Sequence, residues 1–277
     1  MSSFEFASPR TEAEAVELLS AHDGHTAVLA GGTDLVGLLR ADLVSPRRVV
    51  DIKNIDTMKG VTAVTGGLLV GALTTLDEIL VHPLLAGHSA LAQVADGVHA
   101  IQIQSTGTLG GDLCHLPNCW YFRNGYGLLG MRDGESLPAE GRSDFHAILG
   151  NQGPAKFVSA SRFAPALIAL GAKVRIVGPT PDQVALMPLE YFFISPKSDD
   201  QRVTVLQPGQ LVTHVWLPEP AESLVSASYE VLQLEGLDWP LAAAGVALEL
   251  SGGIVKDARI VLGHVAPTPW VSQDAAA

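Results

Sequence analysis

Cysteine is scarce in this chain: Cys114 and Cys119 are the only two among 277 residues. Two thiols cannot build the disulfide framework that stabilises many small secreted domains. Their spacing also differs from the C-x-x-C pair of redox and zinc motifs. The cysteines therefore give no evidence for a disulfide-dependent fold or for a redox thiol pair.

Charged residues are also few, and acidic residues outnumber basic ones. Charged residues make up 17% of the chain, hydrophobic residues make up 47%, and the formal net charge is −12. Because no basic stripe is present, we expect no nucleic-acid partner. The low charge fits a surface that partner subunits cover in part, and it fits a large core equally well.

Long apolar runs are missing. No segment reaches the ~18–20 apolar residues that a membrane-spanning helix needs. The N-terminal MSSFEFASPRTEAEAVELL has neither the basic start nor the apolar run of a signal peptide. We therefore expect a cytoplasmic protein without a membrane span, and export with a signal-bearing partner stays open.

Motifs of metal sites and hydrolases are absent from the sequence. The nine histidines are scattered, and neither H-E-x-x-H nor a carboxylate cluster at ligand spacing occurs. No G-x-S-x-G or other nucleophile–base pattern is present. We therefore expect structural or surface histidines that bind no metal, and the sequence gives no support for hydrolase chemistry.

What is present begins as an alternation of strands and helices. Thr26–Ala30 and Val49–Ile52 are short apolar segments that favour buried strands, and Leu35–Leu43 between them favours a helix. This order predicts a small βαβ unit with parallel strands. Two further apolar segments, at 61–64 and 68–70, are separated by glycines and predict a hairpin.

The last third of the chain is different in character. Strand patterns dominate beyond about residue 178, among them Leu211–Leu217 and Ala242–Leu250. The expected fold class is α+β. We expect an N-terminal domain over 1–176, with two α/β subdomains at about 1–59 and 60–176, and a C-terminal antiparallel sheet with helices over 177–277.

The first glycine loop, residues 29–36 (LAGGTDLV), follows a predicted strand and opens a predicted helix. Gly31 and Gly32 let the backbone approach a ligand without a Cβ in the way. Thr33 and Asp34 lie where the start of a helix leaves N–H groups unpaired, and such a place suits a phosphate. An ordinary tight turn explains this loop as well.

The second glycine loop, residues 105–112 (STGTLGGD), adds hydroxyl groups to a glycine-rich turn. A dinucleotide pyrophosphate carries two negative charges and is often held from two sides, so the two loops together are more informative than either alone. Neither loop fits G-x-G-x-x-G after a first strand. A Rossmann-type nicotinamide site is therefore disfavoured.

Six longer strings resemble the flavin-binding (medium) subunit of the molybdenum hydroxylase, or xanthine dehydrogenase, family. They are LAGGTDLVGLLR (29–40), VGALTTLDEI (70–79), STGTLGGDLCHLPNCWYFRN (105–124), APALIALGA (164–172), DWPLAAAGVAL (238–248) and VLGHVAPTPW (261–270). They follow the family's order over nearly the whole chain. The resemblance implies a PCMH-type FAD-binding domain and a C-terminal domain similar to that of CO dehydrogenase flavoproteins.

The resemblance also implies a cofactor, partners and site residues. Members pass electrons from a molybdopterin-binding large subunit, through [2Fe–2S] centres in a small subunit, to FAD and then to an external acceptor. The implied assembly is a dimer of heterotrimers, in which another subunit oxidises the substrate. The implied FAD-binding residues are Leu29, Ala30, Gly31, Gly32, Thr33, Asp34, Leu35, Val36, Thr106, Thr108, Gly110, Gly111 and Asp112.

CWYFRN (119–124) is similar to the start of an insert in the branch related to 4-hydroxybenzoyl-CoA reductase. There the insert, expected here at about 115–155, holds a [4Fe–4S] cluster, which needs four thiolates. After Cys119 the other ligand positions fall near Leu129, Leu137 and Ala155. We predict an insert without its cluster, in which Cys119 is a buried small hydrophobe.

Three positions depart from the family's pattern. Asp112 replaces the usual Asn or Ser, so its carboxylate must be paired or point away from a pyrophosphate. Arg162 replaces an Asp at a helix start, and one hypothesis is that it approaches a phosphate. Glu230 or Val231, depending on a one-residue gap, replaces a Lys next to the flavin. The chain also ends soon after APTPW, either as a short form or as a truncation.

Three functions follow from these observations. The glycine loops favour an FAD-binding electron-transfer subunit, an oxidoreductase component that is not active alone. The changed positions favour a cofactor-poor structural subunit that has lost FAD and the [4Fe–4S] cluster. An independent flavin oxidase is disfavoured, because no clear substrate-binding set is present. We expect the first of these functions.

Overall fold

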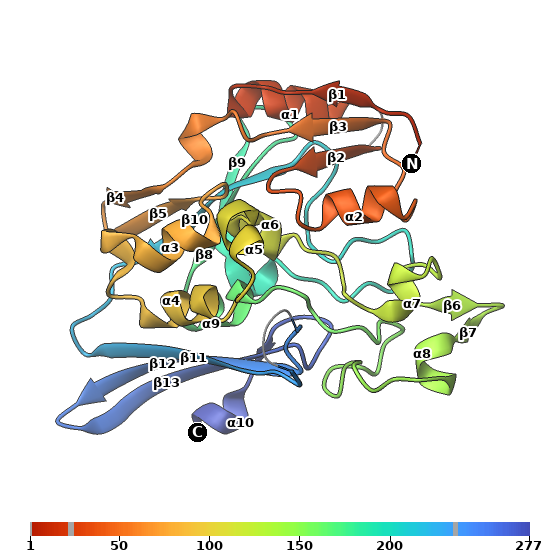
Figure 1. Ribbon diagram of the computed structural model, residues 1–277. Helices are drawn as coiled ribbons and strands as arrows, with labels where there is room; N and C mark the ends of the chain where they lie inside the picture. Colours follow the sequence, from red (N-terminus) through yellow and green to blue (C-terminus); the bar gives the residue numbers. More distant parts are fainter. Residues whose placement is uncertain (1, 22–24, 235–237) are drawn as a thin grey trace.

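The structure is a computed structural model, and it describes residues 2–21, 25–234 and 238–277. Its first part is a three-stranded parallel sheet in the order β1-β3-β2 (Figure 1). The second and third strands in sequence, with the helix between them, confirm the predicted βαβ unit. The elements are β1 (Glu5–Ala7), α1 (Glu12–Ser20), β2 (Thr26–Leu29), α2 (Leu35–Arg40) and β3 (Arg48–Asp51).

The second part contains a five-stranded antiparallel sheet in the order β4-β5-β10-β8-β9 (Figure 1). The predicted hairpin is confirmed as β4 and β5, with Val61 opposite Val70. The strands are β4 (Val61–Val64), β5 (Gly67–Gly71), β8 (Lys173–Val177), β9 (Val184–Pro188) and β10 (Leu211–Pro218), and η2 (Asp56–Met58) precedes them.

The middle strand of this sheet, β10, corrects one expectation. We expected Leu211–Leu217 in the separate C-terminal sheet, but it pairs with β5 on one side and β8 on the other. Most of β10 is buried on both faces, as in a central strand. Strand periodicity marks such a segment as a strand, but it carries no information about which sheet receives it.

The boundary between the two domains remains a prediction. Because β9 and β10 belong to the five-stranded sheet, they favour a boundary later than the expected residue 176. We propose that it lies between Pro218, which ends β10, and Leu224, which starts the next sheet.

The C-terminal part is a four-stranded antiparallel sheet in the order β11-β12-β13-β14, as expected for this region; Figure 1 labels the first three of these strands. One strand, β11, escaped the sequence analysis because its alternation of exposed and half-buried residues is weakly hydrophobic. The elements are β11 (Leu224–Val231), β12 (Ala242–Ser251), β13 (Ile254–Gly263), β14 (Trp270–Val271) and α10 (Gln273–Ala276).

Helix α9 (Phe163–Ala169) joins the two parts, and every one of its residues is buried. It packs against β12 and β13 of the C-terminal sheet. A Cβ at Gly245 would lie 2.5 Å from the backbone nitrogen of Ala166, and one at Gly263 would lie 2.7 Å from the ring of Pro165. Glycine at these two positions therefore allows the sheet to approach the helix.

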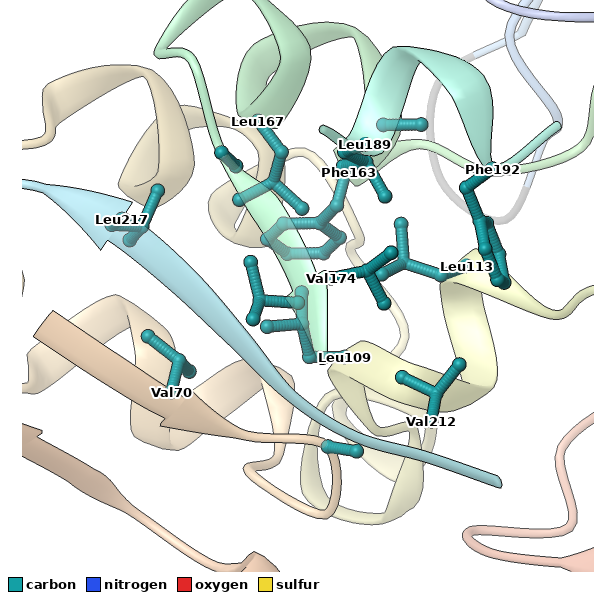
Figure 2. Packing of buried hydrophobic residues seen from close by; sticks show 14 of the residues in the cluster. Val70, Leu109, Leu113, Phe163, Leu167, Val174, Leu189, Phe192, Val212 and Leu217 are labelled. Atoms are coloured by element: carbon teal, nitrogen blue, oxygen red, sulfur yellow. The ribbon is translucent and has the colours of Figure 1, made fainter. Parts of the chain in front are cut away.

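The core gathers side chains from the second glycine loop, α9 and the five-stranded sheet. Figure 2 shows the ring of Phe163 among Leu109, Val174 and Leu189. Burying such a ring stabilises the fold by roughly 1.5–3 kcal/mol. The remaining helices here are α3 (Leu76–Val81), η3 (Pro83–Leu85), α4 (Ser89–Asp96), α5 (Ile101–Thr106), α6 (Leu109–Leu113) and η4 (Leu189–Tyr191).

The predicted insert projects from the body of the molecule (Figure 1). It has a small core of its own, in which Leu129, Ala155 and Phe157 are buried and Cys119 packs against them. The insert contains α7 (Trp120–Arg123), β6 (Met131–Arg132), β7 (Glu135–Ser136) and α8 (Leu137–Glu140).

Candidate cofactor cleft

The two glycine loops meet in space. A Cβ at Gly31 would lie only 1.8 Å from the carbonyl oxygen of Thr106, so the first loop touches the end of α5 through backbone alone. A cleft opens beside this contact. It is lined by residues of both loops, the start of α3, the segment between α4 and α5, α5, the residue before α9 and the C-terminal part: Thr33, Leu76, Val98, His99, Ala100, Ile103, Gly107, Thr108, Gly111, Asp112, His115, Arg162 and Trp239.

The first glycine loop offers free hydrogen-bond donors. Among the described residues, no acceptor contacts the backbone N–H groups of Gly31, Gly32, Thr33 and Asp34. Gly32 has a φ of 76°, a conformation that glycine adopts without strain. Successive N–H groups without partners form a concave anion site, so this loop suits a phosphate.

In the second glycine loop, hydrogen-bond donors are paired with acceptors of the protein itself. The Thr108 hydroxyl accepts from the Gly111 N–H at 3.2 Å and caps α6, and the Gly110 N–H donates to the Ala72 carbonyl at 2.8 Å. The Thr106 hydroxyl donates to the Gln102 carbonyl at 2.6 Å. This loop therefore shapes the wall of the cleft, whereas the first loop supplies the free donors.

Asp34 ties the first loop to the insert. Its Oδ1 accepts from Arg123 Nη1 at 2.6 Å, and its Oδ2 accepts from the Leu116 N–H at 3.2 Å. Arg123 also donates to the carbonyls of Pro117 and Leu116 at 3.0 and 2.9 Å. The Asp34 charge is thus paired, and the start of the insert is held beside the cleft.

Asp112 lines the cleft, and its carboxylate turns toward the start of α9. Its carboxylate accepts from the N–H groups of Arg162 and Phe163 at 3.0 and 3.1 Å, and from the Ser161 hydroxyl. Burial raises the pKa of Asp112, and these three hydrogen bonds oppose the rise. Protein donors therefore pair with the carboxylate, as they must if Asp112 lies near a pyrophosphate.

The other two departures from the family's pattern lie in contact with each other. Nε and Nη2 of Arg162 both donate to the carboxylate of Glu230, and the two side chains are 9% and 8% exposed. Nη2 of Arg162 also donates to the Gly97 carbonyl at 2.9 Å. Val231 is exposed on the other face of β11, so Glu230 is the residue that faces the cleft region.

Aromatic rings also line the cleft, among them those of His115 and Trp239. The rings of His115 and Trp239 lie 5.1 Å apart, and Trp239 meets His264 edge-on at 6.4 Å. His264 is almost fully buried, and burial together with the nearby charges of Arg162 and His115 lowers its pKa to about 3. Trp239 Nε1 is a buried donor without a partner among the described residues.

Four of the predicted FAD-binding residues line the cleft directly: Thr33, Thr108, Gly111 and Asp112. The side chains of Leu29 and Val36 instead pack behind Gly32, within 3.2 Å of where its Cβ would be. Sequence analysis missed Arg123 and His115 as parts of this region. Both stand in the quoted string 105–124, but no spacing rule relates them to a loop 80 or more residues earlier.

The cluster positions of the insert are occupied by apolar packing. Cys119, Leu129 and Ala155 belong to one small core, so the fold brings these three positions together, whereas the fourth, Leu137, is half-buried and lies outside that core. Cys119 Sγ lies 3.2 Å from His146 Nε2, and burial raises the pKa of Cys119 and lowers that of His146, which favours the neutral form of both. Within the described ranges, no three His, Cys, Asp or Glu side chains gather as metal ligands; His22 lies outside them.

No helix of the described residues is both long and apolar enough to cross a membrane.

Comparison with known families accounts for nearly the whole chain. Residues 2–220 match the FAD binding domain in molybdopterin dehydrogenase, and residues 227–277 match the CO dehydrogenase flavoprotein C-terminal domain. The chain belongs to this family of FAD-binding subunits. This confirms the family expected from the sequence and the expected fold class.

Individual relatives agree with this assignment. The chain is 24% identical over 266 residues to the carbon monoxide dehydrogenase medium chain of Hydrogenophaga pseudoflava, covering 96% of this chain and 76% of the relative. It is 27% identical to the putative xanthine dehydrogenase FAD-binding subunit of Escherichia coli, covering 98% and 78%. The assignment to the branch related to 4-hydroxybenzoyl-CoA reductase stays a prediction.

A solved structure shows the same fold. The carbon monoxide dehydrogenase from Hydrogenophaga pseudoflava that lacks the Mo-pyranopterin moiety superimposes with a TM-score of 0.75 at 24% identity, covering 99% of this chain and 79% of the other.

The residues present fit an FAD. The four N–H groups of the first loop that have no acceptor in the described part of the chain suit the pyrophosphate. The apolar walls from Leu76, Val98 and Ile103, with Trp239, suit a planar aromatic ring.

Proposed function

We propose that this chain is the FAD-binding electron-transfer subunit of a molybdopterin-dependent hydroxylase or dehydrogenase. The observation that carries this proposal is the first glycine loop, whose N–H groups from Gly31 to Asp34 have no acceptor among the described residues and open beside an apolar, aromatic cleft. When bound, FAD would supply reversible two-electron chemistry. The protein residues would hold its phosphates and cover its ring.

The proposal includes partners. Relatives are named medium chains or FAD-binding subunits, which supports an assembly with other chains. We expect a molybdopterin-binding large subunit and a [2Fe–2S] small subunit, arranged as a dimer of heterotrimers in the cytoplasm. Electrons would then arrive from the [2Fe–2S] partner and leave to an external acceptor, so the substrate is oxidised elsewhere.

The first experiment is an absorbance spectrum of the purified complex, followed by quantitation of the released flavin. We expect flavin bands and about one FAD for each copy of this chain. A complex that assembles without flavin would contradict the proposal and would make this chain a cofactor-poor structural subunit.

A pair of glycine variants tests the loop itself. Gly32 and Gly60 have similar positive φ angles of 76° and 71°, so alanine should strain both by a similar amount. Gly32→Ala also brings a Cβ within 3.2 Å of Leu29 and Val36, whereas a Cβ at Gly60 meets nothing within 4 Å. We expect Gly32→Ala to weaken FAD binding at least tenfold and Gly60→Ala to leave it unchanged, as measured by quenching of flavin fluorescence. Equal affinity in the two variants would contradict a role of this loop.

A further inference from the structure

One guanidinium lies in the wall of the cleft. Arg162 is the only lysine or arginine among the lining residues that the structure describes. Its Nε and Nη2 are occupied by Glu230 and the Gly97 carbonyl. Its Nη1 contacts no acceptor in the described ranges and is not sealed in the interior. The protein therefore binds one side of this cation and leaves one nitrogen for a group in the cleft.

The position of this cation is set by both domains. Asp112, which ends the second glycine loop, accepts from the backbone N–H of Arg162 at 3.0 Å. Glu230 lies on β11 of the C-terminal sheet and holds the other end of the side chain. The guanidinium is therefore fixed relative to the loops, because both its backbone and its tip are hydrogen-bonded.

The surroundings of Arg162 favour a ring over a phosphate. Val98, Ala100 and Trp239 form an apolar and aromatic wall in the same cleft. Because the buried carboxylate of Glu230 already neutralises the guanidinium, the pair adds little net attraction for a phosphate. The free donors for phosphate lie on the first glycine loop instead.

We infer that Arg162 contacts the isoalloxazine ring of FAD and that Glu230 sets how much of its positive charge the ring experiences. The pair is then a determinant of the flavin reduction potential. This inference rests on the proposed function. Reduction near neutral pH adds two electrons, supplied by the iron–sulfur partner, and one proton from solvent, so the ring gains one negative charge. A guanidinium N–H stabilises that charge, and a neighbouring carboxylate opposes it.

The test is the midpoint potential of the bound flavin, measured by redox titration of the purified complex. Glu230→Gln removes the opposing charge and should raise the potential. A tenfold gain in the relative affinity for reduced flavin corresponds to about 30 mV for a two-electron couple. Arg162→Gln should lower the potential by a similar amount. Arg162→Lys keeps the positive charge, so its potential should stay close to that of the wild type. Opposite shifts from the two partners of one ion pair cannot come from a loss of structure alone.

Arg175→Gln is the matched control, because it breaks another partly buried ion pair, with Glu12, that does not line the cleft. Its potential should equal that of the wild type. Unchanged potentials in Glu230→Gln and Arg162→Gln, with normal FAD content, would overturn the inference and leave the proposed function intact. Weaker FAD affinity at an unchanged potential would also overturn it, in favour of a phosphate contact.

Absence of FAD from the wild-type complex would be a different failure, that of the proposed function itself. Where a glutamine variant does not fold, Glu230→Asp keeps the charge but shortens the reach to Arg162, and it should raise the potential by loosening the pair. An unchanged potential in a folded, flavin-loaded Glu230→Asp variant would overturn the inference.

Discussion

Gly31 faces the carbonyl oxygen of Thr106 so closely that a Cβ on Gly31 would lie 1.8 Å from it. This backbone contact joins the first glycine loop to the end of α5, from which the second glycine loop continues. Two segments that are far apart in the sequence thus share one cleft, and any side chain at position 31 would separate them.

Gly31→Ala should therefore damage the site. The methyl group would push the two loops apart at a cost of about 1–3 kcal/mol, as overpacking usually does. We expect a lower free energy of unfolding and loss of FAD, measured by denaturant titration and flavin content. Gly37→Ala in α2 is the control, since its Cβ meets nothing within 4 Å and should stabilise the helix by about 0.5–1 kcal/mol. Equal effects of the two changes would contradict the contact.

Arg123→Gln should loosen the insert from the first glycine loop. The variant loses the 2.6 Å ion pair with Asp34 and the bonds to the Leu116 and Pro117 carbonyls. We expect faster amide hydrogen exchange at Leu116, because its partner Asp34 is no longer held in place.

The control for Arg123 is Arg142→Gln, which breaks an ion pair with Asp144 that is 74% and 56% exposed. Exposed pairs contribute only about 0–1 kcal/mol, so exchange at Leu116 should not change. The same acceleration in both variants would argue against the specific tie to Asp34.

Leu129→Ala should unfold the insert without unfolding the body. Leu129 belongs to a small core of its own with Ala155 and Phe157, and truncating a buried leucine costs about 2–5 kcal/mol. We expect proteases to cleave between residues 125 and 155 more rapidly, while the main thermal transition stays in place. Leu128 is only partly buried, so Leu128→Ala should have a smaller effect. A shift of the main transition would mean that the insert and the body fold as one unit.

His264 should make the stability pH-dependent. Its folded-state pKa is about 3, below the ordinary value of 6.5, because burial disfavours the charged ring. Between these two values the unfolded chain binds a proton that the folded chain does not, so stability is present above about pH 6.5 and falls as the pH drops toward 3. The contribution of this one residue to the free energy of unfolding changes by up to about 1.4 kcal/mol per pH unit.

His264→Asn is the variant that tests this slope. Asparagine tolerates the φ of 60° at this position and does not titrate. We expect the free energy of unfolding to fall less between pH 7 and pH 5 than in the wild type, whereas His25→Asn, at an exposed position, should keep the wild-type slope. An unchanged slope in His264→Asn would show that the buried imidazole is not the source.

Much of the local structure was predictable because it depends on neighbouring residues. The βαβ unit and the hairpin at Gly66-Gly67 both follow short-range rules, and the structure confirms them. The strand β10 was placed in the wrong sheet, since its apolar pattern is compatible with either one. Asp112 and Glu230 differed from the family's pattern, but their sequence positions did not reveal what would pair with them.

The sequence by itself determined the family, the fold class and the glycine loops, because these rest on ordered motifs and on local backbone chemistry. Only the tertiary structure decided that Asp112 turns toward α9 and that Arg162 meets Glu230. It also decided that Cys119, Leu129 and Ala155 share one apolar core. These contacts join residues far apart in the chain, and their free energies depend on burial and distance, which only the folded chain defines.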